Sequence, residues 1–332
     1  MSANRIRNMI YLLICSIVWG ISFVPQAASM EFIGPFTFNA VRCALGSLVL
    51  IPVIAAAWIL ARRQQATMAT GPCDEYADGE VRIEDMDASM AVYLHVFDRN
   101  TVIGGVLSGI LLFIATNLQT IALKTASAGK GGFITAMYII LVPILGIFLH
   151  KRVRLNVWIS VVIAAAGLYL LCIKERMALK PEDLLLLACA IFFAVQILTV
   201  DKYVPYANGI AMAAIEFGVC SLMSAVVMWM TETPSWVTIG QCRGAIIYAG
   251  ACSCGIAYTL QILGQRDVDP TLASLIMSLE SVTSVIAGAI ILHQFMTGRE
   301  ILGCGLMFVA IILAQLTDVI YSGKRKHINE KQ

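Results

Sequence analysis

Three ionisable side chains lie well inside long apolar runs of this sequence, and they are the first candidates for chemistry. They are Arg42, Glu216 and Glu280, while Glu300 and Asp318 lie nearer the ends of such a run. A charge at the centre of a bilayer costs about 2.5–3.5 kcal/mol on insertion scales, so it usually faces a bundle interior or a water-filled cavity. We therefore interpret the three as candidates for binding a polar ligand or carrying a proton.

Depth within the apolar runs separates these charges. Glu280 lies ten residues into its run, which is roughly 15 Å along a helix and near the middle of a membrane. Arg42 lies roughly 10 Å from one face, and Glu216 lies at a similar depth from the other face. About 9–10 Å of a ~30 Å hydrocarbon core then separates the two along the membrane normal. We expect no direct ion pair between Arg42 and Glu216.

Four further side chains complete the candidate set for substrate binding or coupling. They are Tyr138, Trp19, Gln119 and Gln261. Each candidate also has a structural interpretation. Glu280 could be a neutral acid that is hydrogen-bonded within a bundle, and Arg42 could extend toward the headgroups. The aromatic residues could be ordinary core side chains, and the two glutamines could hold helices together by hydrogen bonds.

Composition excludes a soluble protein. Of 332 residues, 59% are hydrophobic and 13% are charged, with a mean hydropathy of +0.82, whereas soluble domains carry roughly 25% charged residues. The ten cysteines form no CxxC pair and the four histidines no HExxH motif, so we expect no metal and no cofactor and interpret the cysteines as small apolar side chains. The net charge of +2 favours no particular partner, and we expect no nucleic acid.

Ten apolar segments of about membrane-spanning length follow one another along the chain. A helix needs about 20 residues to cross the hydrocarbon core, and helices satisfy their own backbone groups there. The sequence therefore predicts an all-α integral membrane protein with ten transmembrane helices. The segments are 8–27, 35–60, 101–123, 126–149, 155–173, 182–200, 208–230, 240–263, 270–292 and 299–321.

The sequence also contains an internal repeat with two offsets. At an offset of 142 residues, the shorter repeat offset, Gln119 aligns with Gln261 and Tyr138 with Glu280. At an offset of 174 residues, the longer repeat offset, Arg42 aligns with Glu216. Repeats of fixed offset indicate repeated architecture. Because each half holds five spans, the second half enters the membrane from the opposite face. We expect two inverted five-helix repeats with a site near the midplane between them.

The two offsets differ because the first half carries an insertion. We place the first repeat at 1–173, with a polar acidic cytoplasmic insert at 61–100, the second repeat at 174–323, and a basic cytoplasmic tail at 324–332. With the N-terminus inside, 15 of the 23 Lys and Arg residues lie on the inner side, 7 on the outer side, and Arg42 within a span. This bias predicts that both termini are cytoplasmic, in a multi-pass protein of the cell membrane, such as a bacterial inner membrane.

Several short stretches of the sequence carry a recognisable pattern. They are Trp19-Gly20, Phe23-Val24-Pro25-Gln26, the run from Gly34 to Arg42, Asn117-Leu118-Gln119, the run from Gly132 to Ala136, and Ser278-Leu279-Glu280 followed by Gly288. Together they resemble one family of membrane proteins, the EamA-like branch of the drug/metabolite transporter superfamily. One stretch differs: many members have Leu-Gly-Glu where this chain has Leu292-His293-Gln294.

The repeat and the resemblance together predict a secondary transporter that works by alternating access and exports a small amino acid-like, polar or amphipathic metabolite. Proton coupling suits Glu280, because a buried carboxyl group is costly to ionise. An uncoupled exchanger or facilitator is the alternative within this class. A receptor, a scaffold or a membrane-embedded enzyme is the alternative from other classes, but His95, His150, His293 and His327 lie in loops or at span ends, and we expect no enzyme. The expected partners are a small-molecule substrate and the lipid bilayer, and a homodimer is compatible with the sequence.

The charge bias generates a first prediction about topology. Single cysteines introduced by Glu75→Cys or Lys326→Cys should be protected in intact cells from an impermeant thiol reagent and should react once the cells are opened. Reaction of either cysteine from outside would reverse the orientation.

Overall fold

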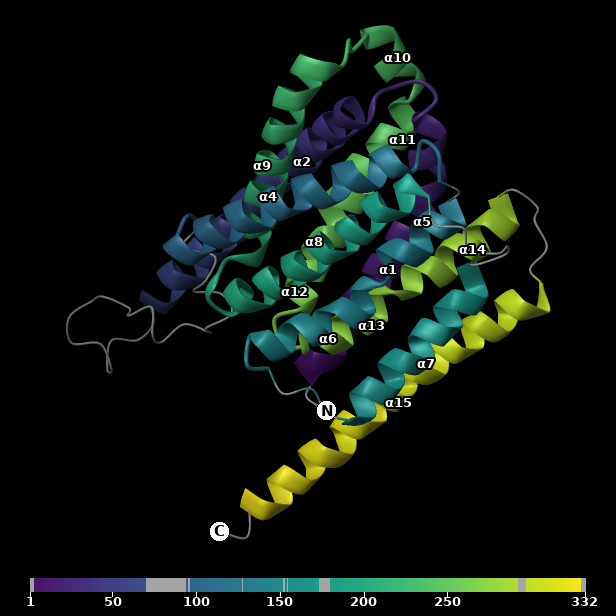
Figure 1. Cartoon of the computed structure of the whole chain (residues 1–332). Helices are drawn as coiled ribbons and strands as arrows, with labels where there is room; N and C mark the ends of the chain where they lie inside the picture. Colours follow the sequence, from purple (N-terminus) through teal and green to yellow (C-terminus); the bar gives the residue numbers. More distant parts are fainter. Residues whose placement is uncertain are drawn as a thin grey trace.

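The computed structural model describes residues 3–69, 94, 96–126, 128–151, 153, 155–172, 180–291 and 297–329, and every regular element in these ranges is a helix (Figure 1). The elements are α1 (Ala3–Ser29), α2 (Pro35–Ala69), α4 (Arg99–Ala122), α5 (Ala128–Thr135), α6 (Tyr138–Phe148), α7 (Leu155–Cys172), α8 (Pro181–Tyr203), η2 (Val204–Tyr206), α9 (Gly209–Thr231), α10 (Trp236–Gln241), α11 (Arg243–Ile247), the π-helix η3 (Tyr248–Tyr258), α12 (Thr259–Gly264), α13 (Pro270–Met277), α14 (Leu279–Ile291) and α15 (Gly298–Asn329).

The lengths and compositions of these helices are those of a membrane protein. Seven stretches are long and apolar enough to cross a membrane: Asn4–Ser29, Pro35–Arg63, Arg99–Ala122, Pro181–Tyr206, Gly209–Thr231, Arg243–Gly264 and Pro270–Ala287. Three shorter apolar helices, Tyr138–Phe148, Val157–Leu170 and Ile301–Ala314, fall in the remaining three predicted segments. Large apolar side chains such as Phe148 and Trp229 are about four-fifths exposed, as suits helices surrounded by lipid. The chain is an all-α membrane protein.

Helix starts follow local sequence rules. Pro181 and Pro270 occupy the first turns of α8 and α13, where a missing N–H costs nothing. Asp98, Asn208 and Asp269 cap α4, α9 and α13 through side-chain oxygens that accept hydrogen bonds from backbone N–H groups of the first turn, as such residues commonly do. The turns between spans are therefore specified by the chain itself.

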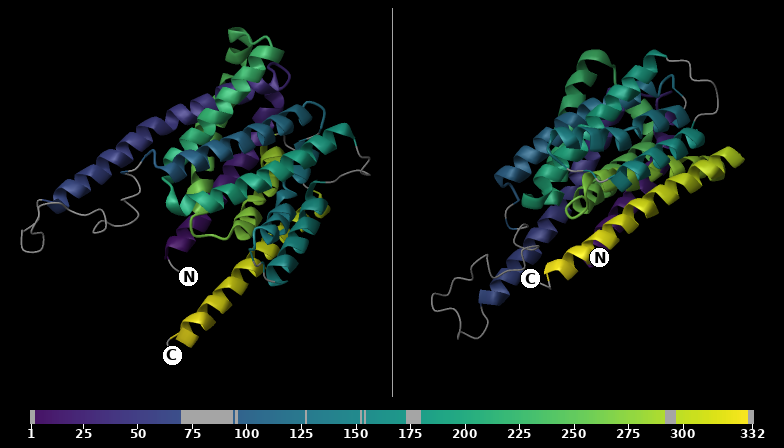
Figure 2. Two further views of the ribbon diagram at one scale, coloured as in Figure 1. Left: turned by 60° about the vertical axis from the view of Figure 1, so that its left-hand side comes forward. Right: turned by 60° about the horizontal axis from the view of Figure 1, so that its bottom comes forward.

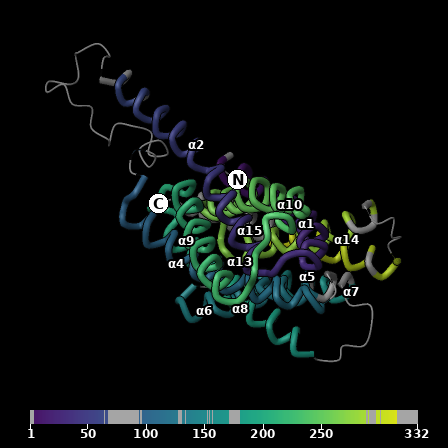
Figure 3. Tube along the Cα trace, turned by 90° about the horizontal axis from the view of Figure 1, so that it is seen from above, coloured from purple at the N-terminus to yellow at the C-terminus, as the bar shows by residue number. Residues whose placement is uncertain are grey.

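Two helices extend beyond the segments predicted for them. The helix α2 continues to Ala69, into the predicted acidic insert, and α15 continues to Asn329, into the predicted tail. Figures 2 and 3 show the end of α2 projecting away from the other helices. Residues 70–93 and 95 of the insert, 173–179 at the predicted repeat boundary, and Leu292-His293-Gln294 lie outside the described residues.

Two of the predicted spans are broken in the middle, at equivalent places. The span that begins with α5 breaks at Ala136-Met137, and the span that begins with α13 breaks at Ser278, which aligns with Ala136 at the shorter repeat offset. Each break contains a tight turn, in which Ile139 N–H donates to Ala136 C=O and Ser281 N–H donates to Ser278 C=O, both at 3.1 Å. Such i to i−3 bonds tighten a helix and often mark functional sites within it.

The helices α2 and α9 contact each other reciprocally. The Ser47 hydroxyl donates to Ala214 C=O at 2.9 Å, and the Ser221 hydroxyl donates to Ala40 C=O at 2.8 Å. Ser47 aligns with Ser221 at the longer repeat offset, and Ala40 aligns with Ala214. A two-fold relation between two segments would produce reciprocal contacts of this kind. The pair α7 and α15 also lie side by side (Figure 1).

Close approach of α4 to α9 generates a second prediction. A Cβ atom added at Gly109 would lie 2.7 Å from Glu216 C=O and 2.8 Å from Val219 Cβ, whereas one added at Gly305 in α15 would meet nothing within 4 Å. Gly109→Ala should therefore lower stability by about 1–3 kcal/mol, as overpacking typically does, and reduce the midpoint of thermal unfolding in detergent. Gly305→Ala is the matched control and should unfold at the wild-type temperature or above, because alanine favours helix. Equal midpoints would show that α4 and α9 are not this close.

Candidate functional site

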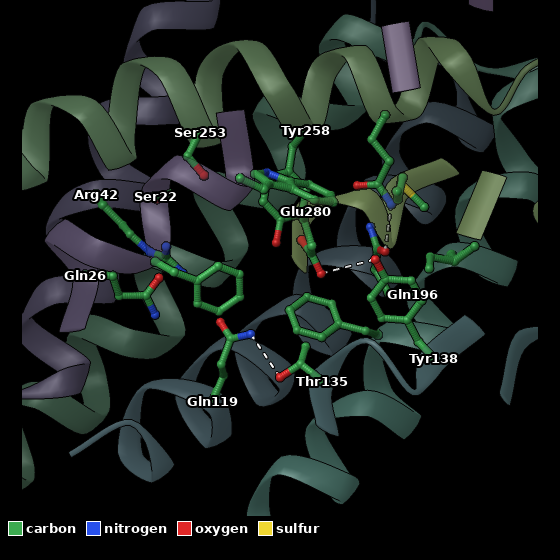
Figure 4. A pocket seen from close by; sticks show the side chains of 16 residues that line it. Ser22, Gln26, Arg42, Gln119, Thr135, Tyr138, Gln196, Ser253, Tyr258 and Glu280 are labelled. Carbon is green, nitrogen blue, oxygen red and sulfur yellow. Dashed lines mark hydrogen bonds between the residues drawn. The ribbon is translucent and has the colours of Figure 1, made fainter. Parts of the chain in front are cut away.

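A pocket lies within the bundle (Figure 4). Small-molecule sites commonly combine apolar walls with a few polar groups. Side chains from α1, α2, α4, α5, α6, α8, η3, α12, α13 and α14 surround the pocket. The lining residues are Trp19, Ser22, Phe23, Gln26, Arg42, Gln119, Thr135, Tyr138, Phe193, Gln196, Ile197, Ser253, Tyr258, Gln261, Met277 and Glu280.

The pocket brings together six of the seven candidate residues. Glu216 does not line it, although its side chain is fully buried. The six that line the pocket are Trp19, Arg42, Gln119, Tyr138, Gln261 and Glu280. They come from spans that are distant in the sequence, so folding places them around one space.

Tyr138 and Glu280 contact each other in the wall of the pocket. The Tyr138 hydroxyl donates to Glu280 Oε1 at 3.2 Å, and the two residues are 3% and 5% exposed. They belong to the first turns of α6 and α14, directly after the two helix breaks. Half-helices that begin at mid-membrane direct unpaired backbone N–H groups and a positive dipole end into a site. The two residues are also equivalent at the shorter repeat offset.

Arg42 is buried without a carboxylate partner. Its side chain is 4% exposed, its guanidinium carbon lies 5.3 Å from the centre of the Phe38 ring, and Nε has no hydrogen-bond partner. The described part of the chain places no carboxylate within ion-pair distance of it, in agreement with the expected absence of an Arg42–Glu216 pair. Arg42 therefore faces the pocket.

The remaining walls combine aromatic rings with polar atoms that have no partner. The Trp19 and Tyr258 rings are tilted at 56° with centroids 4.5 Å apart, and the Phe217 ring meets Tyr258 edge-on at 5.3 Å. Trp19 Nε1, Ser22 Oγ, Arg42 Nε and Gln261 Oε1 are buried and unpaired. Buried polar atoms are normally hydrogen-bonded, so these four are available to a bound ligand. Across the described residues no cluster of His, Cys, Asp and Glu could hold a metal ion.

Comparison with known proteins gives one family match and one relative. Residues 180–316, from α8 into α15, match the model of the EamA-like transporter family. A protein of Archaeoglobus fulgidus described as an uncharacterized transporter is 23% identical over 316 residues, which cover 94% of this chain and 87% of that protein. Both matches support the EamA-like transporters as the family that this chain resembles.

The comparisons thus support a membrane transporter, and the resemblance found in the sequence is confirmed. One solved crystal structure, described only as that of a protein, is similar with a TM-score of 0.68 and 18% identity, covering 93% of this chain and 96% of that one. At that identity the likeness shows the fold alone.

Gln196 is one of the pocket residues that sequence reasoning missed, and it has the most hydrogen-bond contacts to the candidate residues. Its Nε2 donates to Glu216 Oε1 at 2.9 Å, and its Oε1 accepts from Gln261 Nε2 at 3.2 Å. Gln196 therefore connects Glu216, which lies behind it, to the pocket surface. A signal was present, because Gln196 is an uncharged polar residue in the middle of the apolar segment 182–200. Its alignment with Ser22 at the longer repeat offset gave a second signal.

The Gln196–Glu216 hydrogen bond generates a third prediction. Glu216 Oε2 already has no partner, so Gln196→Leu would leave both carboxylate oxygens unpaired in the transporter interior. This substitution should lower the free energy of unfolding by about 1–3 kcal/mol. Combining it with Glu216→Leu should restore part of the loss, because removing both partners leaves no buried unpaired group. Thermal unfolding in detergent measures both, and strictly additive losses would contradict the pairing.

Proposed function

We propose that the protein is an alternating-access secondary transporter built from two inverted five-helix repeats, 1–173 and 174–323, with the pocket as its substrate site. The observation that carries this proposal is the composition of the pocket wall. Twelve of the sixteen lining residues form six pairs at the two repeat offsets. The pairs are Trp19 with Phe193, Ser22 with Gln196 and Phe23 with Ile197 at the longer offset, and Gln119 with Gln261, Thr135 with Met277 and Tyr138 with Glu280 at the shorter offset.

The paired wall supports alternating access because a site shared equally by two inverted repeats can open toward either face when the repeats rock against each other. The reciprocal α2–α9 hydrogen bonds and the equivalent breaks after α5 and α13 support the same relation. The terminal basic segment 324–332 and the insert 61–100 fall outside this relation.

The chemistry of the pocket supports a small zwitterionic or amphipathic substrate. Arg42 offers an unpaired cation to an anionic group, since a guanidinium matches a carboxylate well. Glu280 offers a carboxyl group to a cationic group or to a proton, and Tyr138 orients it. Trp19 and Tyr258 supply aromatic area for an apolar part. Amino acid-like metabolites combine these three features.

The proposal includes proton-coupled export across the cell membrane with both termini cytoplasmic, and the Lys and Arg distribution supports that orientation. An uncoupled exchanger is the alternative that the same pocket supports, because Glu280 can bind a substrate cation without exchanging a proton.

Reconstitution tests the proposal. Purified protein in proteoliposomes should accumulate members of a radiolabelled panel of zwitterionic, anionic and cationic metabolites above the level of empty liposomes, with zwitterions taken up most. Arg42→Gln should reduce uptake of the best zwitterion at least ~10-fold, which corresponds to ~1.4 kcal/mol. Absence of uptake for the whole panel would favour a receptor, scaffold or enzyme.

Glu280→Gln provides a fourth prediction, since glutamine keeps the shape and hydrogen bonding of the side chain but cannot ionise. The variant should fold normally and lose transport, or retain exchange that no longer responds to the proton gradient. Glu31→Gln, which changes an exposed carboxylate, is the matched control and should behave as wild type. Wild-type transport by Glu280→Gln at every pH would remove Glu280 from the site.

A further inference from the structure

The pocket departs from its own symmetry at one end. Gln26 and Arg42 line it, but their equivalents at the longer repeat offset, Val200 and Glu216, do not. Gln26 lies three residues before the end of α1 and Arg42 seven after the start of α2. Val200 and Glu216 hold the same positions in α8 and α9. The pocket therefore extends toward the α1–α2 end of the bundle and stops short of the α8–α9 end.

Polar contacts between the two halves join helices at the α8–α9 end. Lys151 forms an ion pair with Asp201 near the end of α8. Asn208, which caps α9, donates its N–H to the Thr101 hydroxyl at 2.8 Å. Across the same half-to-half boundary, Asn8 Nδ2 donates to Asp267 Oδ2 at 2.9 Å.

Arg42 and Glu216 occupy matched surroundings. The serine–carbonyl pairs between α2 and α9 flank both residues reciprocally. A glycine lies against the backbone at each: a Cβ added at Gly250 would lie 2.9 Å from Arg42 C=O, and one added at Gly109 would lie 2.7 Å from Glu216 C=O. The two positions differ in what the side chain reaches. Arg42 reaches the pocket, whereas Glu216 is covered by Gln196, and its Oε2 has no partner.

Alternating access between inverted repeats requires the two halves to exchange conformations. From this relation, which rests on the proposed function, we infer that Glu216 lines the pocket in the opposite-facing state, where it binds the cationic group of the substrate while Arg42 is withdrawn behind Ser22. The pocket then presents a cation toward one face of the membrane and a carboxylate toward the other. The equivalence of Ser22 and Gln196 identifies the side chains that cover each charge in turn.

The sign reversal between the two faces has a consequence for specificity. A substrate with only an anionic group would bind the Arg42 face and be repelled at the Glu216 face. A zwitterion has a favourable partner in both states. The two charges thus select zwitterions over simple anions for complete transport.

Chemical modification of the wild-type protein from each face tests this inference. Right-side-out and inside-out vesicles are treated with an impermeant arylglyoxal, which modifies arginine, or with an impermeant carbodiimide and an amine, which modify carboxylates. Modified residues are identified by mass spectrometry. Arg42 should react from one face and Glu216 from the opposite face. Reaction of Glu216 from the same face as Arg42, or from neither face, overturns the inference.

A crosslink tests whether opening of the α8–α9 end exposes Glu216. Asn8→Cys with Asp267→Cys, joined by a short bismaleimide, should hold the α8–α9 end closed. Modification of Arg42 should persist in the crosslinked protein and that of Glu216 should disappear. Modification of Glu216 at the wild-type level despite the crosslink counts against exposure by opening of this end.

Transport kinetics separate a recognition role from a structural one. With a radiolabelled neutral α-amino acid as the probe, Glu216→Gln should raise KM about tenfold or more on the face where Glu216 reacts and leave KM on the Arg42 face unchanged. Arg42→Gln should do the opposite. Equal changes on both faces would make Glu216 a structural residue. If the protein transports the amino acid and Glu216→Gln changes KM on neither face, only this inference is wrong. If the protein transports nothing, the proposed function is wrong as well.

Discussion

The rest of the structure depends on one constraint: hydrocarbon offers no hydrogen-bond partners, so every polar group within the membrane must be satisfied inside the protein. A chain of buried amides and hydroxyls illustrates this. Gln26 Nε2 donates to Thr120 Oγ1, Asn39 Nδ2 donates to Asn117 Oδ1, and Asn117 Nδ2 donates to Ser224 Oγ, at 2.9–3.3 Å. These bonds hold α1, α2, α4 and α9 together where apolar contact alone would not distinguish protein from lipid.

Because buried polar groups are normally paired, the unpaired polar atoms indicate where a ligand could bind. Most buried polar side chains of the described residues are paired. Of the unpaired atoms, four, on Trp19, Ser22, Arg42 and Gln261, belong to residues of one pocket, and others, such as Asn39 Oδ1 and Gln265 Oε1, lie outside it. The same region contains both helix breaks, at which backbone groups are freed from the regular ladder. Irregular backbone inside a membrane is tolerated where it lines a cavity or is covered by protein. Site, breaks and unpaired atoms therefore have a common physical origin.

Equivalent positions at the two repeat offsets fall into two groups, those with side chains of similar polarity and those with side chains of different charge. Residues that match across the halves, such as Gln119 and Gln261, or Phe23 and Ile197, keep similar polarity and supply a wall that either half can present. Arg42 and Glu216 occupy equivalent positions but carry opposite charges. Tyr138 and Glu280 also occupy equivalent positions and are hydrogen-bonded to each other, but only Glu280 carries a carboxyl group. Differences at equivalent positions are where a substrate can distinguish one half from the other.

The sequence by itself determined the helices and their order, and it predicts a correspondence between two halves. Hydropathy and capping act locally, so a run of about 20 apolar residues becomes a helix whatever surrounds it, and residues such as Asp98 and Pro270 define where helices start. The same local reasoning singled out Arg42, Glu280 and Tyr138, because polar groups inside apolar runs are costly and rarely accidental. It also matched Tyr138 with Glu280 before their contact was known.

Only the tertiary structure decided which polar side chains share a space. Direction around a helix depends on which neighbour it packs against, and apolar spans have no distinct polar face to reveal that direction. The sequence therefore did not identify Gln196, although its side chain connects Glu216 to the pocket. It also did not show that Arg42 lines the pocket whereas Glu216 lies behind Gln196. The place of each helix break was likewise decided in the fold, because a tight turn in mid-membrane is stable only where other helices cover its freed backbone groups.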